Sequence, residues 1–225
     1  MTAEQFLFQV SVLALPTVLA ITLHEAAHGF AAWRLGDDTA WRAGRVSFNP
    51  LRHVDPFGTV ILPAILYFTT HFLFGWAKPV PVNFSRLNHP RRDMVLVALA
   101  GPGINFALAI GSALLLGWVD LLPAVARDWA AQNLENSVII NVLLAAFNLL
   151  PLPPLDGGRV AVGLLPLVLA RQLARMERFG IVLLMAVLFL LPYVGARLGL
   201  RLDLIGWLLD GPVTYLFNRI MVLAG

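Results

Sequence analysis

Long apolar runs alternate with short polar stretches along this chain. The first apolar run extends over about 6–33, and others cover 94–119, 136–150, 179–196 and 204–225. A helix rises about 1.5 Å per residue, so about 20 apolar residues cross the hydrocarbon core of a bilayer. The pattern therefore predicts an all-α polytopic membrane protein with about five to six membrane segments.

Two polar stretches separate the early apolar runs. The first, 34–56, contains turn residues and a short segment, "GRVSF" at 44–48, whose composition indicates a strand. We therefore expect short β elements in this loop. The second, 78–92, is rich in proline, and Pro79 and Pro81 keep its start out of a helix.

The composition agrees with a membrane location. Hydrophobic residues make up 59% of the 225 residues and charged residues only 13%, whereas soluble domains have about 25% charged residues. We expect one membrane-embedded domain over 1–225, with a core at about 6–160 and C-terminal membrane segments at about 179–225. The chain has no cysteine, which excludes thiolate zinc sites, iron–sulfur clusters and a cysteine nucleophile.

The basic residues indicate how the chain is oriented in the membrane. Of its 16 Lys and Arg residues, 12 lie in 34–56, 78–92 and 159–178. Clustering between apolar runs favours a membrane-orientation signal over nucleic-acid binding, and the positive-inside rule places these loops in the cytoplasm. Segment 57–77 must then enter and leave on one side as a re-entrant hairpin; an ordinary span is the alternative. We expect a multi-pass protein of the plasma membrane.

Three titratable side chains interrupt the first apolar run: His24, Glu25 and His28, in "HEAAH". On a helix, positions i and i+4 share a face, so the two imidazoles can bind one metal ion with Glu25 near an activated water. Burying such groups in a membrane is costly without a partner. The alternative is a structural pair of histidines bridged to Glu25. Arg34 follows nine residues after Glu25, about 13 Å along the axis, which indicates a site near the cytoplasmic side.

A catalytic zinc usually has three protein ligands and one open position. The candidates for the third ligand are His53, His71, His89 and Asp156. We favour Asp156, because the prolines of "PLPPLDGG" end the preceding helix near the membrane face, at a depth comparable with the HEAAH motif. The alternative for Asp156 is a helix cap in a turn.

Three motifs together resemble the site-2 protease family of intramembrane zinc metalloproteases: HEAAH at 24–28, AGPGIN at 100–105 and NLLPLPPLDGG at 148–158. The loops "GRVSFNPLRHVDPFG" and "FGWAKPVPVN" are similar to those of its compact bacterial and archaeal members, and we expect no PDZ-like or CBS-like domain. The resemblance implies cleavage of a transmembrane substrate helix near the cytoplasmic side.

The resemblance also implies roles for individual residues. One zinc per chain would be held by His24, His28 and Asp156, with Glu25 as the general base. Suitable partners are the lipid bilayer and a single-span membrane protein or a signal-peptide remnant, without nucleic acid. The sequence does not define the oligomeric state.

Four further residues are candidates for contact with the substrate. An Asn in a membrane helix needs a partner, so Asn148 and Asn105 can bind the substrate backbone or the oxyanion; helix–helix hydrogen bonding is the alternative. The extended segment around Val80 and Val82 can pair with an unwound substrate by strand addition; a structural loop is the alternative.

We predict an intramembrane zinc metalloprotease from these features. The alternative from another class is an intramembrane metal-binding transporter or sensor, since buried His and Asp also line ion paths. Many transporters have paired broken helices and an internal repeat, and neither is evident in this sequence. A proteolytically inactive binding protein is a third reading, against which the intact Glu25 argues.

Overall fold

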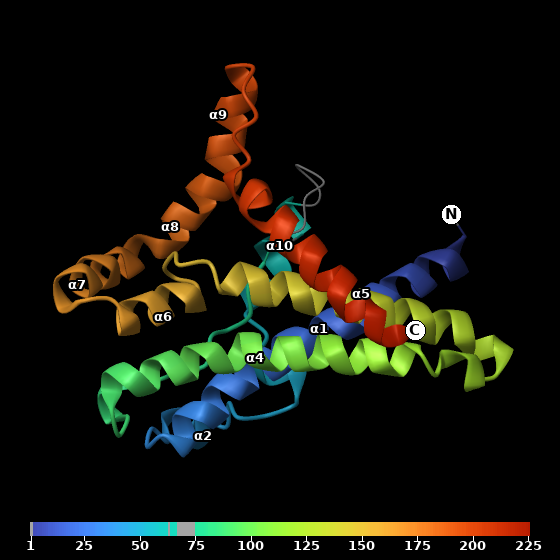
Figure 1. Ribbon diagram of the computed structural model, residues 1–225, viewed down its shortest axis with the longest axis horizontal. Helices are drawn as coiled ribbons and strands as arrows, with labels where there is room; N and C mark the ends of the chain where they lie inside the picture. Colours follow the sequence, from blue (N-terminus) through green and yellow to red (C-terminus); the bar gives the residue numbers. More distant parts are fainter. Residues whose placement is uncertain (1, 63, 67–74) are drawn as a thin grey trace.

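The structure, a computed structural model, describes residues 2–62, 64–66 and 75–225. Four long helices form its central bundle (Figure 1): α1 (Ala3–Arg34), α4 (Pro90–Leu116), α5 (Ala124–Asn148) and α10 (Leu204–Met221). The sequence 156–197 forms a chain of shorter helices, of which α8 and α9 project away from the bundle in Figure 1. These helices are α6 (Asp156–Leu164), α7 (Leu167–Met176), η5 (Glu177–Phe179), α8 (Gly180–Met185), η6 (Ala186–Leu190) and α9 (Leu191–Arg197).

The remaining described elements are short and lie in the loops or at the C-terminus. They are α2 (Thr39–Arg42), η1 (Pro50–Arg52), η2 (Pro56–Ile61), η3 (Phe84–Arg86), η4 (Val119–Leu121) and η7 (Val222–Ala224).

Helix α1 begins with a capping box, in which Thr2 and Gln5 exchange backbone and side-chain hydrogen bonds. Its buried face is made mainly of small residues, among them Ala20, Ala26 and Ala32. The facing surface of α4 is similar, with Ala98 and Gly101 buried. Small residues allow two helix backbones to approach closely, which is how membrane helices commonly pack.

Three stretches in the described part of the chain are long and apolar enough to cross a membrane: Ala3–Arg34, Pro90–Leu116 and Leu167–Arg197. They confirm an all-helical membrane protein with several spans. The count of five to six segments stays a prediction. The predicted re-entrant hairpin at 57–77 falls in part on residues 63 and 67–74, which lie outside the described ranges.

The prediction of short β elements is wrong for the residues that the structure describes, because none of them forms a strand. A strand at 44–48 needs a neighbouring ladder of amides and carbonyls. The adjacent segment 78–83 cannot supply one, because Pro79 and Pro81 carry no N–H and the Val80 amide donates to a side chain. Instead, Arg45 Nη2 donates to the Lys78 carbonyl at 2.5 Å, so a side chain joins the two segments.

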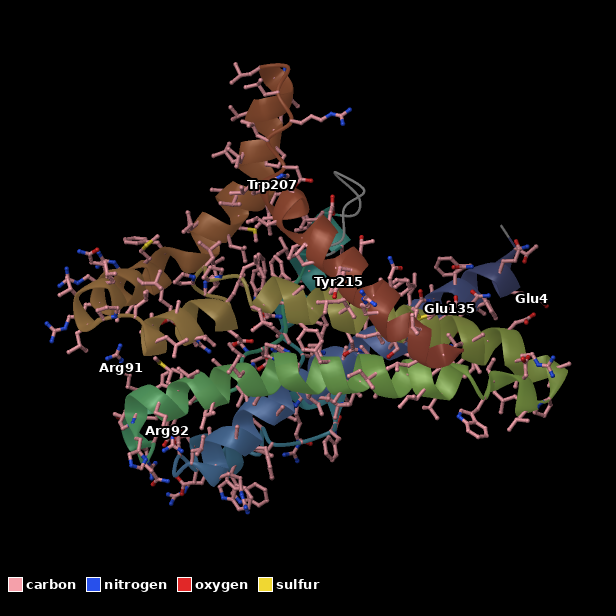
Figure 2. All side chains as sticks on the ribbon, viewed as in Figure 1. Glu4, Arg91, Arg92, Glu135, Trp207 and Tyr215 are labelled. Atoms are coloured by element: carbon pink, nitrogen blue, oxygen red, sulfur yellow. The ribbon has the colours of Figure 1, made fainter. Side chains whose placement is uncertain are left out.

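The three basic stretches meet at one end of the bundle. Arg86 forms an ion pair with Asp38 at 3.1 Å, which joins the first stretch to the second. Arg91 donates to the Leu165 carbonyl, which joins the second to the third. Figure 2 shows Arg91 and Arg92 at this end and Glu4 at the opposite end. The charge asymmetry seen in the sequence is therefore also an asymmetry of the folded molecule.

Candidate metal centre

Helix α1 and the first residue of α6 bring the polar residues of two motifs together. The i, i+4 spacing in α1 places His24 and His28 on one buried face. After α5 the chain turns through 149–155, which includes a cis bond between Pro153 and Pro154. It then enters α6 at Asp156, whose side chain is buried against the two histidines.

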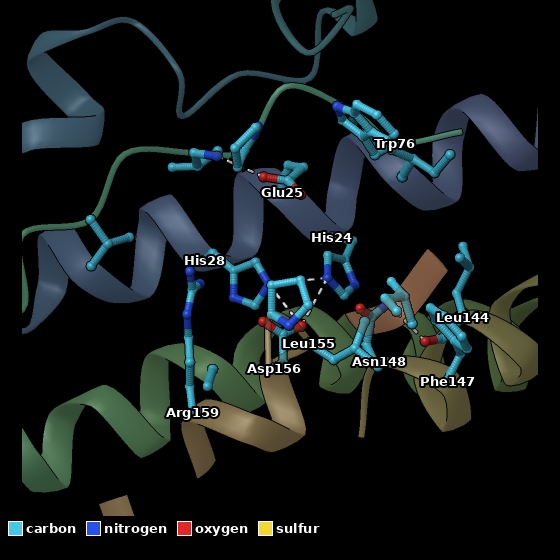
Figure 3. A pocket seen from close by; sticks show the side chains of 18 of the residues that line it. His24, Glu25, His28, Trp76, Leu144, Phe147, Asn148, Leu155, Asp156 and Arg159 are labelled. Atoms are coloured by element: carbon cyan, nitrogen blue, oxygen red, sulfur yellow. Dashed lines mark hydrogen bonds and ion pairs between the residues drawn. The ribbon is translucent and has the colours of Figure 1, made fainter. Parts of the chain in front are cut away.

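Three side-chain atoms converge at this point (Figure 3). His24 Nε2 and His28 Nε2 are 3.0 Å apart, and each lies 3.2 Å from Asp156 Oδ2. All the ligand atoms lie within 4.8 Å of one another, and all three residues are buried. Among the described residues this is the one cluster of His and acidic groups with metal-site geometry.

The hydrogen bonds of the two Nδ1 atoms determine the tautomer of each histidine ring. His28 Nδ1 lies 2.7 Å from the Val97 carbonyl oxygen, and His24 Nδ1 lies 2.6 Å from Asn105 Oδ1. Both oxygens only accept hydrogen bonds, so each Nδ1 carries the proton. In its neutral form, each ring then directs the lone pair of Nε2 toward the cluster, as metal-binding histidines do.

The cluster fits a divalent cation. Two nitrogen lone pairs and a carboxylate oxygen face one another, and Asp156 Oδ2 has no hydrogen-bond partner in the described part of the chain. One shared proton would satisfy one of these contacts, whereas a cation satisfies all three. Two imidazoles and one carboxylate are also a typical ligand set of catalytic zinc, which keeps a fourth position open.

Gly101 of α4 lies directly beside the cluster. A Cβ atom at this position would lie 2.6 Å from His24 Nε2 and would also collide with His28 Nε2. Any residue larger than glycine would therefore occupy the space in which the ligand atoms meet. Gly103, two residues later, has no neighbouring heavy atom within 4 Å of such a Cβ.

Glu25 lines the same cavity as His24, His28 and Asp156. This cavity has a volume of about 370 Å³. Figure 3 shows Glu25 on the side of α1 that faces the segment leading from Trp76, and its Oε2 accepts a hydrogen bond from the Val80 amide at 2.8 Å. The Nε2 atoms of the two histidines instead face Asp156 Oδ2, each at 3.2 Å. A structural His–Glu–His bridge is therefore not the arrangement in the described structure.

Comparison with known proteins identifies the family. The model of "Peptidase family M50" matches residues 123–192. A Bacillus subtilis (strain 168) protein named "Putative zinc metalloprotease YwhC" is 38% identical over 188 residues, which cover 80% of each chain. A Mycobacterium tuberculosis (strain ATCC 25618 / H37Rv) protein named "Putative zinc metalloprotease Rip2" is 34% identical over 198 residues, 86% of this chain and 71% of the relative. The chain belongs to peptidase family M50.

This membership confirms the resemblance to the site-2 proteases and the prediction of an intramembrane zinc metalloprotease. It confirms zinc as the cofactor, and it does not favour the transporter or sensor alternative. No solved structure matches the chain significantly.

Among the sequence candidates for the third ligand, the described structure brings only Asp156 to the two histidines of α1. His53 Nε2 contacts the Ser47 carbonyl at 2.9 Å. His89 has a side chain that is 70% exposed and lies 3.8 Å from Asp93. His71 lies outside the described residues.

The two asparagine candidates have different surroundings. Asn148 lines the cavity, and its Nδ2 donates to the Leu144 carbonyl at 3.0 Å. Asn105 is fully buried, and its amide contacts His24 and Asn141. Asn148 therefore borders the cavity, while Asn105 lies behind His24 and contacts its ring.

The segment 78–83 is fixed at both ends. At one end, Lys78 N donates to the His53 carbonyl at 2.8 Å. At the other, the fully buried Asp37 accepts from Asn83 N at 2.6 Å and from Thr39 Oγ1 at 2.5 Å. Burial alone would raise the pKa of Asp37, but the hydrogen bonds from Thr39 and from the Asn83 amide outweigh it and hold the pKa below its usual value. This ionised carboxylate anchors the segment that passes over Glu25.

Sequence reasoning missed Asn141, Gly101 as an individual residue, and Arg159. Arg159 lines the cavity, pairs with Glu177 at 3.1 Å and lies over the Phe84 ring. The signal for Asn141 was its position in the apolar run 136–150, where a lone amide needs a partner. Gly101 lies in the AGPGIN motif, but only its distance from the histidines gives it a role.

Proposed function

We propose that His24, His28 and Asp156 hold the single zinc of this M50 protease, and that Glu25 is the general base of peptide-bond hydrolysis. The observation that supports this most directly is the convergence of two imidazole lone pairs and one carboxylate oxygen within 4.8 Å. When bound, zinc acts as a Lewis acid that polarises a peptide carbonyl and makes water acidic enough to be deprotonated near neutral pH.

Glu25 is suited to move the proton. A carboxylate has two oxygens and about four acceptor positions. Its Oε2 is held by the Val80 amide, which leaves Oε1 to take a proton from the attacking water. The protonated carboxyl then delivers this proton to the nitrogen of the leaving amine as the C–N bond breaks. The Val80 hydrogen bond to Oε2 thus orients Glu25 while Oε1 accepts and delivers the proton.

Asn148 is the candidate for stabilising the oxyanion. Its Nδ2 already donates to the Leu144 carbonyl, but an amide nitrogen carries two hydrogens, so one remains for a substrate oxygen in the cavity. Removing an oxyanion donor typically lowers turnover by about 10²- to 10³-fold.

The segment 78–82 is the candidate for holding an unwound substrate by strand addition. Within it, the amides of Lys78 and Val80 are already bonded, and Pro79 and Pro81 have none. Val82 therefore carries the amide that can donate to a substrate strand, next to the carbonyls that can accept from it. Val80 and Val82 both line the cavity, so their side chains can also contact the substrate.

We further propose that the basic end of the bundle faces the cytoplasm of a plasma-membrane protein, by the positive-inside rule. The peptide bond that is cut then lies near the cytoplasmic side. The substrate class is a single-span membrane protein or a signal-peptide-like remnant. The count of five to six membrane segments, with 57–77 as a re-entrant hairpin, belongs to this proposal.

The test is a cleavage assay with single-span peptides in detergent or liposomes, run beside elemental analysis for zinc. Glu25→Gln is nearly isosteric, so we expect it to keep zinc at the wild-type level and to lose at least about 10²-fold in turnover. The control is Glu135→Gln, which removes an exposed carboxylate of α5 and should change neither quantity. Wild-type turnover in Glu25→Gln would remove Glu25 as the base, and loss of zinc would make it structural.

A further inference from the structure

A chain of buried amides runs from the metal centre into α5. His24 Nδ1 lies 2.6 Å from Asn105 Oδ1. Asn105 Nδ2 donates to Asn141 Oδ1 at 2.7 Å, and Asn141 Nδ2 donates to the Ser137 carbonyl at 2.9 Å. Asn105 and Asn141 are both fully buried. The catalytic chemistry proposed above does not use Asn141.

The direction of every hydrogen bond in this chain follows from its last member. The Ser137 carbonyl can only accept, so Asn141 must turn its NH₂ group toward it. Asn141 Oδ1 then faces Asn105 and accepts a hydrogen bond from the NH₂ group of Asn105. The Ala20 carbonyl, 3.4 Å from Asn105 Nδ2, favours the same orientation. Asn105 Oδ1 is left facing His24, where it accepts the Nδ1 proton.

This order of donors and acceptors decides the tautomer of His24. With the proton on Nδ1, the ring directs a lone pair from Nε2 at the metal position. If the Asn105 amide turned over, its NH₂ group would face Nδ1. Nδ1 would then have to accept, the proton would move to Nε2, and Nε2 could no longer bind a metal.

The second histidine of the site has no such relay. His28 Nδ1 faces the Val97 backbone carbonyl at 2.7 Å, and a backbone carbonyl cannot exchange donor for acceptor by rotating. Only the tautomer of His24 therefore depends on a side chain that can turn over, and His28 serves as a control within the same molecule.

We propose that Asn141 is a positioning residue that fixes the metal-binding tautomer of His24 by locking the orientation of the Asn105 amide. The inference rests on the proposed function, in which His24 binds zinc. Its test is chosen to be independent of cleavage and of bound metal, so that the two can fail separately.

The measurement is ¹⁵N NMR of histidine-labelled, metal-free protein at alkaline pH, where imidazoles are neutral. The two ring nitrogens have different shifts when protonated, and His24→Gln and His28→Gln identify the signals. In the wild type we expect both rings to carry the proton on Nδ1. In Asn141→Leu, His24 should shift wholly or partly to the Nε2–H form, while His28 stays unchanged.

Two further variants complete the design. Asn133→Leu removes another buried amide of α5, which donates to the Trp129 carbonyl of its own helix, and should leave both rings as in the wild type. Asn141→Asp keeps an oxygen toward Asn105 and should retain the Nδ1–H form. It also serves if Asn141→Leu does not fold.

Zinc affinity, measured by competition with a chelator, gives a second readout. We expect about 10- to 100-fold weaker binding in Asn141→Leu, the usual effect of a residue that orients a ligand, and no change in Asn133→Leu. An Nε2–H form of His24 in the wild type overturns the proposal. So does an unchanged His24 in folded Asn141→Leu, or loss of the Nδ1–H form in Asn141→Asp.

Discussion

Replacing Gly101 with alanine puts a methyl group where the ligand atoms meet. The new Cβ would lie 2.6 Å from His24 Nε2, whereas ordinary contacts begin at 3.4 Å. The His24 imidazole would have to move away by about 0.8 Å. Asn105 Oδ1 blocks this movement, because it lies only 2.6 Å from Nδ1 on the opposite side of the ring. His28 Nε2 meets the same methyl group, so neither ligand can move without disturbing the other.

A shift of this size is large for a metal site. Zinc–nitrogen distances are about 2.0–2.1 Å and tolerate deviations of about 0.2 Å. We therefore expect Gly101→Ala to weaken zinc binding by at least about a hundredfold, or roughly 2.7 kcal/mol. Alanine favours a helix over glycine by about 1 kcal/mol, so α4 itself should not be weakened.

The assay is competition for zinc between the purified protein and a chromophoric chelator, with circular dichroism to check the fold. Gly103→Ala is the matched control, because it makes the same change two residues away in open space and should bind zinc as the wild type does. Wild-type affinity in folded Gly101→Ala would mean that zinc does not lie between His24, His28 and Asp156, and the reasoning would be refuted.

Two other predictions concern the segment that passes over Glu25. Val82→Pro removes the backbone amide that remains for a substrate strand, so it should lower cleavage at least about tenfold and leave the zinc content unchanged. The control Val82→Ala keeps this amide and should cleave nearly as fast as the wild type. Equal cleavage by both variants would reject strand addition through Val82. Asp37 has a lowered pKa, so its stabilising effect is complete above its usual value of 3.8 and is lost as the pH falls through the lower folded value. Asp37→Asn should therefore reduce the free energy of unfolding by about 1–3 kcal/mol at pH 7 and by less at pH 3, which lies below the usual value, as measured by thermal or denaturant unfolding. An equal loss at both pH values would contradict an ionised Asp37.

Much of the fold follows from local patterns. The apolar runs near 6–33, 94–119 and 179–196 correspond to the three stretches long enough to span a membrane, because a continuous apolar run needs no tertiary information to identify it. The predicted strand at 44–48 failed because a strand depends on a partner. The prolines of the facing segment and the use of its Val80 amide by Glu25 remove that partner, and only the folded structure brings the two segments together.

The predictability of the site divides in the same way. The stacking of His24 and His28 follows from the i, i+4 spacing of one helix. Asp156 required a choice among distant candidates, and depth in the membrane was enough to favour it. Gly101 and Asn141 act through distances of a few ångströms between helices, which no spacing within one helix encodes.

The proposed zinc site joins His24 and His28 of α1 to Asp156, more than 120 residues later in the chain. The zinc content of the protein tests this proposal most directly. Elemental analysis of protein purified without chelators should give about one zinc per chain in the wild type and much less in Asp156→Asn. Asp93→Asn is the control, because Asp93 is also a buried carboxylate in the first turn of a helix and lies in α4 away from the cluster. We predict that it retains the wild-type zinc content. A wild type without zinc, or an Asp156→Asn variant that holds as much zinc as the wild type, would contradict the account.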